Sequence, residues 1–172
     1  ARDVKTPEDL AGVNLRMPGA DTWMFLGEAL GANPTPLAFG EVYTALQTGA
    51  IDGQDNPLPT VFAAKFYEVT EQIVLTSHLV DGVFLALAAQ TWNGLDDRQK
   101  RAVEHAAAGA VLFNNTNRIA QEGELLEFFR EHGLQVTEPD VDAFREHVQR
   151  AYLESEYSKD WPEGLLDRIN AE

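Results

Sequence analysis

The feature that most constrains this chain is the alternation, near its start, of short apolar runs with runs that suit a helix. Val13–Met17 and Thr35–Phe39 are apolar enough to form buried strands, and Ala20–Leu30 and Gly40–Thr48 follow them with apolar residues at helical spacing. Such alternation is typical of βαβ units and a parallel sheet. The pattern therefore predicts an α/β fold, with a parallel or mixed sheet flanked by helices.

Further apolar runs extend this prediction. Strands are expected at Ile73–Thr76, Val83–Ala89 and Gln135–Thr137, and the first two are apolar enough to be buried on both faces. Pro34 and Pro36 cannot donate ladder hydrogen bonds, so the strand that contains them is expected either to lie at a sheet edge or to start late. Shorter helices are expected to begin at Pro7 and to cover residues 60–65, 141–152 and 161–169.

The longest predicted element is a helix that reaches from Asp96 to His132 without a proline and is closed by Gly133. About 36 residues at 1.5 Å each span roughly 54 Å, more than the width of a small lobe. A helix of that length is expected either to cross between two lobes or to kink, and Gly109 and Gly123 are the candidate kink points.

Composition excludes several function classes. The 172 residues can bury one sizeable core. A formal net charge of −15 argues against binding to nucleic acid or anionic lipid, and the absence of cysteine excludes disulfides and thiol chemistry. No apolar run is long enough to span a membrane, and no signal peptide is recognised.

Three side chains are the candidate ligand-binding residues: Arg16, Phe39 and Asn56. Arg16 and Phe39 are expected at the carboxyl ends of strands and Asn56 after a third turn, and ligands bind at this edge of α/β sheets. The planar fork of arginine suits a carboxylate. The alternative is structural: an arginine after a strand is often a surface ion-pair partner, and an asparagine before a proline is often a turn residue.

Catalytic and metal-binding patterns are not recognised. The four histidines show no metal-ligand spacing, and His78, at the end of a predicted strand near the expected crevice, has a structural role as its simplest interpretation. There is no phosphate loop and no Gly-x-Ser-x-Gly elbow. The sequence therefore predicts a protein that is not an enzyme and carries no cofactor or metal.

Six segments, in order along nearly the whole chain, resemble one family: the solute-binding proteins of tripartite ATP-independent periplasmic (TRAP) transporters, of the C4-dicarboxylate/sialic-acid type. They are Leu15–Pro18 (LRMP), Asn33–Pro36 (NPTP), Phe39–Gln47 (FGEVYTALQ), Ile51–Leu58 (IDGQDNPL), Lys65–Val69 (KFYEV) and Pro139–Asp140.

The resemblance implies a periplasmic receptor with a binding-protein-like fold, which captures an organic acid and delivers it to the membrane permease subunits. In that family an arginine matching Arg16 pairs with the ligand carboxylate, an asparagine matching Asn56 adds hydrogen bonds, and an aromatic residue matching Phe39 lines the pocket. Asp55, beside Asn56, is expected to point away from an anionic ligand.

The chain departs from the family in length, because family members are about twice as long and have two α/β lobes. The resemblance implies that residues 1–81 and 122–172 form the second lobe. The strand and long helix within residues 82–121 would then belong to the first lobe. With most of the first lobe missing, ligand binding is expected to be weak.

Three hypotheses remain open from the sequence. The first is a ligand-binding receptor lobe. The second is a non-binding assembly module that forms a homo-oligomer through the exposed first-lobe face, chiefly the strand at Val83–Ala89 and the long helix. The third is a small hydrolase with unrecognised residues.

Overall fold

The computed structural model describes residues 2–80 and 82–171. It has parallel strands flanked by helices, so the predicted α/β class is confirmed. Short 3-10 helices also occur, at Pro7–Leu10 (η1), Phe39–Glu41 (η2), Phe66–Glu68 (η3) and Glu156–Ser158 (η4). The strands are β1 (Asn14–Met17), β2 (Asn33–Pro36), β3 (Gly53–Gln54), β4 (Gln72–Val74) and β5 (Gln135–Thr137). The α-helices are α1 (Asp21–Ala29), α2 (Val42–Thr48), α3 (Leu58–Ala63), α4 (Ala89–Asn93), α5 (Asp97–Glu131), α6 (Val141–Glu154) and α7 (Leu165–Asn170).

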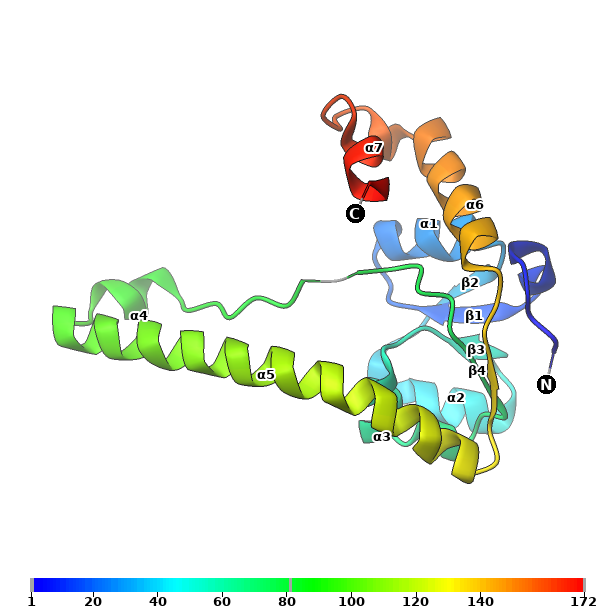
Figure 1. The fold of residues 1–172 in the computed structure, drawn as a ribbon, viewed down its shortest axis with the longest axis horizontal. Coiled ribbons are helices and arrows are strands. Elements are labelled where there is room, and N and C mark those ends of the chain that lie inside the picture. Colours follow the sequence, from blue (N-terminus) through cyan, green and yellow to red (C-terminus); the bar gives the residue numbers. More distant parts are fainter. Residues whose placement is uncertain (1, 81, 172) are drawn as a thin grey trace.

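The strands form two separate parallel sheets. One has the order β2-β1-β3 and the other pairs β4 with β5. The proline-containing strand β2 lies at an edge, as predicted. Helices α1 and α6 lie on one side of the strands, and α2 and α3 on the other (Figure 1).

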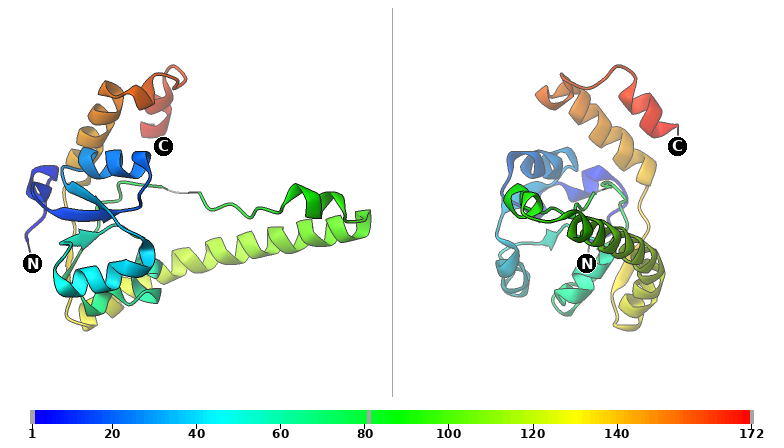
Figure 2. Two further views of the ribbon diagram at one scale, coloured as in Figure 1. Left: turned by 180° about the vertical axis from the view of Figure 1, so that it is seen from behind. Right: turned by 90° about the vertical axis from the view of Figure 1, so that its left-hand side faces the viewer.

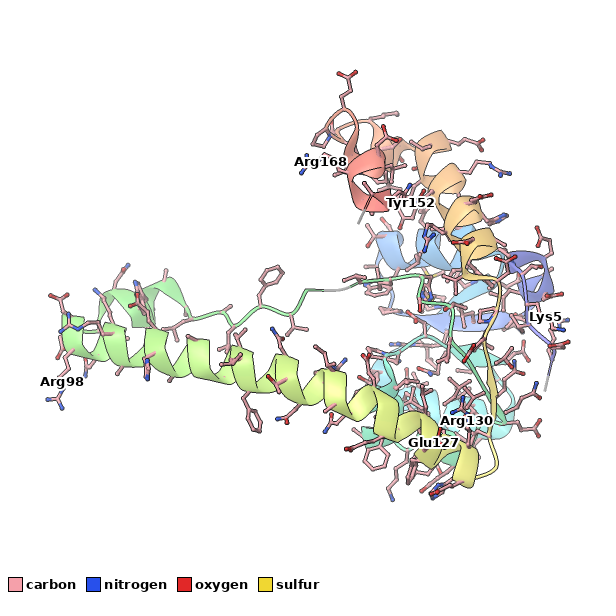
Figure 3. The ribbon with its side chains drawn as sticks, in the orientation of Figure 1. Lys5, Arg98, Glu127, Arg130, Tyr152 and Arg168 are labelled. Carbon is pink, nitrogen blue, oxygen red and sulfur yellow. The ribbon has the colours of Figure 1, made fainter. Side chains whose placement is uncertain are left out.

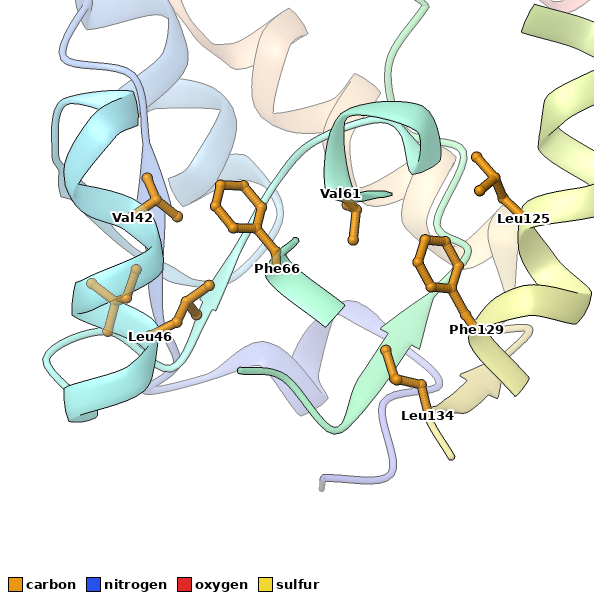
Figure 4. Close-up of a cluster of buried hydrophobic side chains, with 8 residues drawn as sticks. Val42, Leu46, Val61, Phe66, Leu125, Phe129 and Leu134 are labelled. Carbon is orange, nitrogen blue, oxygen red and sulfur yellow. The ribbon is translucent and has the colours of Figure 1, made fainter. Parts of the chain in front are cut away.

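Two apolar clusters hold these layers together. The first packs α2, α3 and the end of α5 around Val42, Phe66 and Phe129, each at most 2% exposed (Figure 4). The second packs α1 and α6 around Met17 and Phe144, which are fully buried. Burying a side chain of this size contributes about 1.5–3 kcal/mol, so these positions dominate the stability of the fold.

The predicted long helix is confirmed. Asp96 caps α5, because its Oδ1 accepts the backbone N–H of Gln99 at 2.8 Å. Gly109 and Gly123 lie within uninterrupted helix. Only the last part of α5 packs on the body of the molecule, and the rest extends far outward, with Arg98 near its distant end (Figures 2 and 3).

The strand predicted at Val83–Ala89 is wrong. Residues 82–88 are extended but pair with no strand among the described residues, and Ala89 begins α4. Val83 and Phe84 are each 90% exposed. The prediction failed because a strand needs a sheet edge to pair with, and this segment runs beside the outer half of α5 instead (Figure 1).

Candidate functional site

The candidate site is built around Arg16, a buried cation in β1, the middle strand of the three-stranded sheet. The residue is 4% exposed, and its Nε donates a hydrogen bond of 2.9 Å to the carbonyl oxygen of Leu37. Leu37 follows the end of β2, the register neighbour of β1. The parallel pairing of these strands therefore brings the Leu37 carbonyl to the guanidinium.

Arg16 has no carboxylate within ion-pair distance in the part of the chain that the structure describes. Burial lowers the pKa of Arg16 from its ordinary value, and the negative charge of Asp55 opposes this shift. Arginine remains protonated in proteins, so a buried charge stays at this position. A buried cation without a partner is costly, and an incoming anion would relieve that cost.

Phe39 lies beside Arg16, as predicted. It begins the short helix η2, and its ring centroid lies 5.9 Å from the guanidinium carbon of Arg16. The ring also packs edge-on against Phe66, with centroids 5.6 Å apart. Phe66 belongs to the apolar core, whereas Phe39 remains 48% exposed. One part of the ring is thus anchored, and another part is open to a ligand.

Asn56 reaches the same sheet edge through β3. Its Nδ2 donates a hydrogen bond of 2.5 Å to Oε1 of Gln54, and Gln54 is the register partner of Arg16. No hydrogen bond joins Asn56 to Arg16 among the described residues. The fold therefore brings the elements carrying the three predicted side chains to the carboxyl ends of β1, β2 and β3.

A polar pair next to this edge was not predicted. Asp55 Oδ1 lies 3.4 Å from Nε2 of His78, and both side chains are less than one-fifth exposed. His78 Nδ1 lies 2.5 Å from the Thr76 hydroxyl oxygen. The position of His78 after a strand was the only sequence signal for this pair, and nothing in the sequence pointed to Asp55 as its neighbour.

A cavity lies outside this group of three residues. It measures about 670 Å³ and opens between the two sheets, where β3 and β4 line it together with the Asp55–His78 pair. Arg16, Phe39 and Asn56 do not line it. The three candidate residues therefore lie outside this cavity.

The described residues contain no group of three or more histidine and acidic side chains that could hold a metal ion. Among the same residues, no helix combines the length and apolar character needed to cross a bilayer.

Comparisons with known proteins place this geometry in a family. Residues 1–159 match the bacterial extracellular solute-binding proteins, family 7. The sialic acid-binding periplasmic protein SiaP of Vibrio cholerae is 40% identical over 153 residues, which are 89% of this chain and 48% of that protein.

Solved structures of TRAP periplasmic solute-binding proteins are also similar to this chain. One is a TRAP periplasmic solute-binding protein of Roseobacter denitrificans with bound 3-deoxy-D-manno-oct-2-ulosonic acid. It matches this chain with a TM-score of 0.93 and 58% sequence identity, and the match covers 99% of this chain and 56% of that chain. A second structure, from the same species with bound L-galactonate, matches with a TM-score of 0.83 and 35% identity. This match covers 92% of this chain and 53% of that chain. The chain thus spans about half the length of the relatives it matches.

Proposed function

Because the chain belongs to the bacterial extracellular solute-binding proteins, family 7, we propose that it is the ligand-binding part of a TRAP-transporter receptor that captures a small organic acid. Members of this family are substrate-binding proteins rather than enzymes. The single observation that carries the proposal is the buried guanidinium of Arg16, which forms no ion pair among the described residues and lies beside the half-exposed ring of Phe39.

Arg16 would bind the acid group of the ligand. Its Nε is held by Leu37, which orients the planar fork and leaves the two terminal nitrogens to donate a pair of hydrogen bonds to a carboxylate. Phe39 would cover the apolar face of the ligand, and the Asn56 amide would contribute polar contacts from β3. Asp55 contacts His78 rather than forming an ion pair with Arg16, so the terminal nitrogens of Arg16 stay available to the ligand carboxylate.

Acid sugars are the ligand class that we favour. The similar proteins are described as binding sialic acid, 3-deoxy-D-manno-oct-2-ulosonic acid and L-galactonate, all of which carry a carboxylate. A less similar structure contains sn-glycerol-3-phosphate, so a phosphate ester is the natural competitor in an experiment.

We further propose that the chain is part of a two-lobed receptor in the periplasm that delivers its ligand to the membrane permease. We assign residues 1–81 and 122–172 to the second lobe and residues 82–121 to the first; the boundaries at 1, 81 and 172 lie outside the described residues. All residues of the two buried apolar clusters fall within the ranges assigned to the second lobe. A ligand that contacts both lobes would favour their closure.

The homo-oligomer expected from the sequence gains no support from these comparisons. Exposed apolar side chains within residues 82–121, including Phe84, Leu112 and Phe113, are also those that a first lobe would cover. The assembly-module hypothesis is therefore not favoured.

A thermal-shift titration tests the proposal. The purified chain is heated with increasing 3-deoxy-D-manno-oct-2-ulosonic acid, L-galactonate or sn-glycerol-3-phosphate. Stabilisation that saturates with either acid sugar is expected, because a ligand that binds only the native state raises the melting temperature. With a single lobe, the affinity is expected to be weak.

Two variants and a control make the test specific. Arg16→Met should weaken binding by about thirtyfold or more, since losing one partner of a buried charge pair costs about 2–5 kcal/mol. Arg16→Lys should retain part of the binding affinity, because lysine keeps the positive charge but lacks the planar guanidinium. Arg145→Met removes an exposed arginine paired with Asp142 and should leave affinity unchanged. Equal binding by Arg16→Met and the unaltered chain would contradict the proposal.

A further inference from the structure

A hydrogen bond links two amide side chains beside the candidate site. Nδ2 of Asn56 donates to Oε1 of Gln54 over 2.5 Å, and the bond is partly buried. Gln54 is the last residue of β3 and the register partner of Arg16 on β1. Paired residues of neighbouring strands project from the same face of a sheet, so Gln54 shares the face of Arg16 and its bond holds Asn56 on that side.

The backbone around Asn56 explains how the two amides meet. β3 ends at Gln54, and α3 begins at Leu58 after the N-cap residue Pro57, so Asn56 belongs to neither element. A proline favours an extended backbone for the residue that precedes it. In an extended segment, residues i and i+2 project from one face, which brings the side chain of Asn56 beside that of Gln54.

The orientation of the Asn56 amide depends on this partner. The terminal torsion of asparagine is broad and roughly two-fold, so rotation exchanges the positions of the amide oxygen and nitrogen. The oxygen accepts hydrogen bonds and the NH2 group donates them, so the two orientations offer a ligand opposite chemistry. Because Oε1 of Gln54 can only accept, its bond selects the orientation in which Nδ2 faces Gln54.

A second glutamine–asparagine pair shows what is particular about this one. Nε2 of Gln149 donates to Oδ1 of Asn170 at 2.8 Å, and Nδ2 of Asn170 donates to Oε1 of Gln149 at 3.0 Å. That reciprocal pair ties α6 to α7 and uses an acceptor and a donor of each amide. The pair beside Arg16 is one-way, and Oδ1 of Asn56 accepts no hydrogen bond from the described residues. It therefore sets an orientation while leaving polar atoms of Asn56 for a ligand.

From this contact we propose that Gln54 is a positioning residue of the candidate site, which holds the Asn56 amide in the orientation that binds the organic acid. The inference rests on the proposed function, because it assigns Gln54 a part in the same site. Gln54 acts through Asn56 and makes no contact of its own with the ligand. Without Gln54 the amide must be ordered during binding, and immobilising one side chain lowers affinity by about two- to tenfold.

A double-mutant cycle tests this role. Isothermal titration calorimetry measures the affinity for 3-deoxy-D-manno-oct-2-ulosonic acid of the unaltered chain, Gln54→Met, Asn56→Ala and the double variant. Methionine keeps the approximate length of glutamine and removes the amide. Gln54→Met should weaken binding by about two- to tenfold in the unaltered chain, but by less than about twofold in the Asn56→Ala background.

Gln149→Met is the matched control, because it breaks the glutamine–asparagine pair between α6 and α7 and should leave the affinity unchanged. A second measurement needs neither a ligand nor a stable variant. In NMR spectra of the unaltered chain, the side-chain NH2 protons of Asn56 should exchange with solvent more slowly than those of Asn115, which is exposed. Gln54→Met should remove this difference. Equal exchange at the two asparagines of the unaltered chain would overturn the proposal.

The titrations separate this inference from the proposed function. Equal affinity of Gln54→Met and the unaltered chain would overturn the positioning role, as would equal losses in the two backgrounds of the cycle. Binding that is lost in Arg16→Met but unchanged in Asn56→Ala would refute the positioning role and leave the Arg16 contact standing. An unaltered chain that binds no organic acid would refute the proposed function, and this inference with it.

Discussion

The guanidinium carbon of Arg16 lies 5.9 Å from the ring centroid of Phe39, and the same ring packs edge-on against Phe66 in the core. The cation is buried while the ring stays half exposed. Phe39 therefore links the candidate ligand contact to the apolar cluster around Val42, Phe66 and Phe129. This coupling leads to the first of four predictions.

Phe39→Ala should weaken acid-sugar binding by about two- to thirtyfold, because removing a ring that faces a cation and a ligand costs about 0.5–2 kcal/mol. Phe39→Tyr should bind nearly as well as the unaltered chain. The thermal-shift titration measures both.

Phe62→Ala is the matched control for Phe39→Ala. Phe62 is similarly exposed, at 43%, but packs against Tyr67 and Phe128, away from Arg16. Phe62→Ala should therefore lower the melting temperature without changing the affinity for the acid sugar. If both alanine variants lose affinity equally, Phe39 acts through stability alone.

Phe129→Ala and Phe113→Ala should differ sharply, although both positions lie on α5. Phe129 is fully buried, and its truncation should cost about 3–5 kcal/mol of unfolding free energy. Phe113 is 72% exposed and should change stability by less than about 0.5 kcal/mol. Urea denaturation of the two variants gives both values, and a large loss for Phe113→Ala would mean that the outer part of α5 is covered in solution.

Glycine-to-alanine substitutions should have opposite effects at Gly31 and Gly109. Gly31 has φ +91°, and a Cβ there would lie 2.6 Å from the Pro7 carbonyl oxygen, so Gly31→Ala should destabilise the fold by more than about 1 kcal/mol. Gly109 lies within α5 with open space around it, so Gly109→Ala should stabilise by up to about 1 kcal/mol. Urea denaturation midpoints would test the pair, and a stabilising Gly31→Ala would refute the close contact.

Asp9 should make stability depend on pH in the acid range. Its carboxylate accepts the backbone N–H groups of Lys5 and Thr6 at 2.9 and 3.0 Å, and these bonds lower the pKa of Asp9. Because the pKa of Asp9 is lower in the folded state than the unfolded value of about 3.9, Asp9 stabilises the fold at pH values above about 3.9. This stabilisation is lost as the pH falls through the lowered pKa.

Asp9→Asn should therefore be less stable than the unaltered chain near neutral pH, and the two should converge once the pH is well below about 4. Urea denaturation across pH 2–7 checks this, and a gap that persists in acid would show that Asp9 acts through something other than its charge.

Much of the local structure could be predicted from the sequence. Helix α5 begins at the cap of Asp96 and ends before Gly133, and both signals are local. The edge position of β2 follows from two prolines that cannot donate in a ladder. The clustering of Arg16 and Phe39 follows from a general property of parallel sheets, that the carboxyl ends of strands share one edge. The roles of Arg16, Phe39 and Asn56 in binding stay predictions.

Other features depended on segments that are distant in sequence. The apolar run at Val83–Ala89 has the composition of a buried strand, yet pairing requires a sheet edge, and none lies beside it in the described residues. The pairing of Asp55 with His78 and the cavity between β3 and β4 depend on how two sheets are spaced.

The sequence by itself thus determined such features as the ends of α5 and the edge position of β2, because caps and prolines act within a few residues. Only the tertiary structure decided that Arg16 is buried with no ion-paired carboxylate among the described residues, and that the strands form two separate sheets. Those outcomes depend on which distant groups come into contact, and no local pattern encodes that.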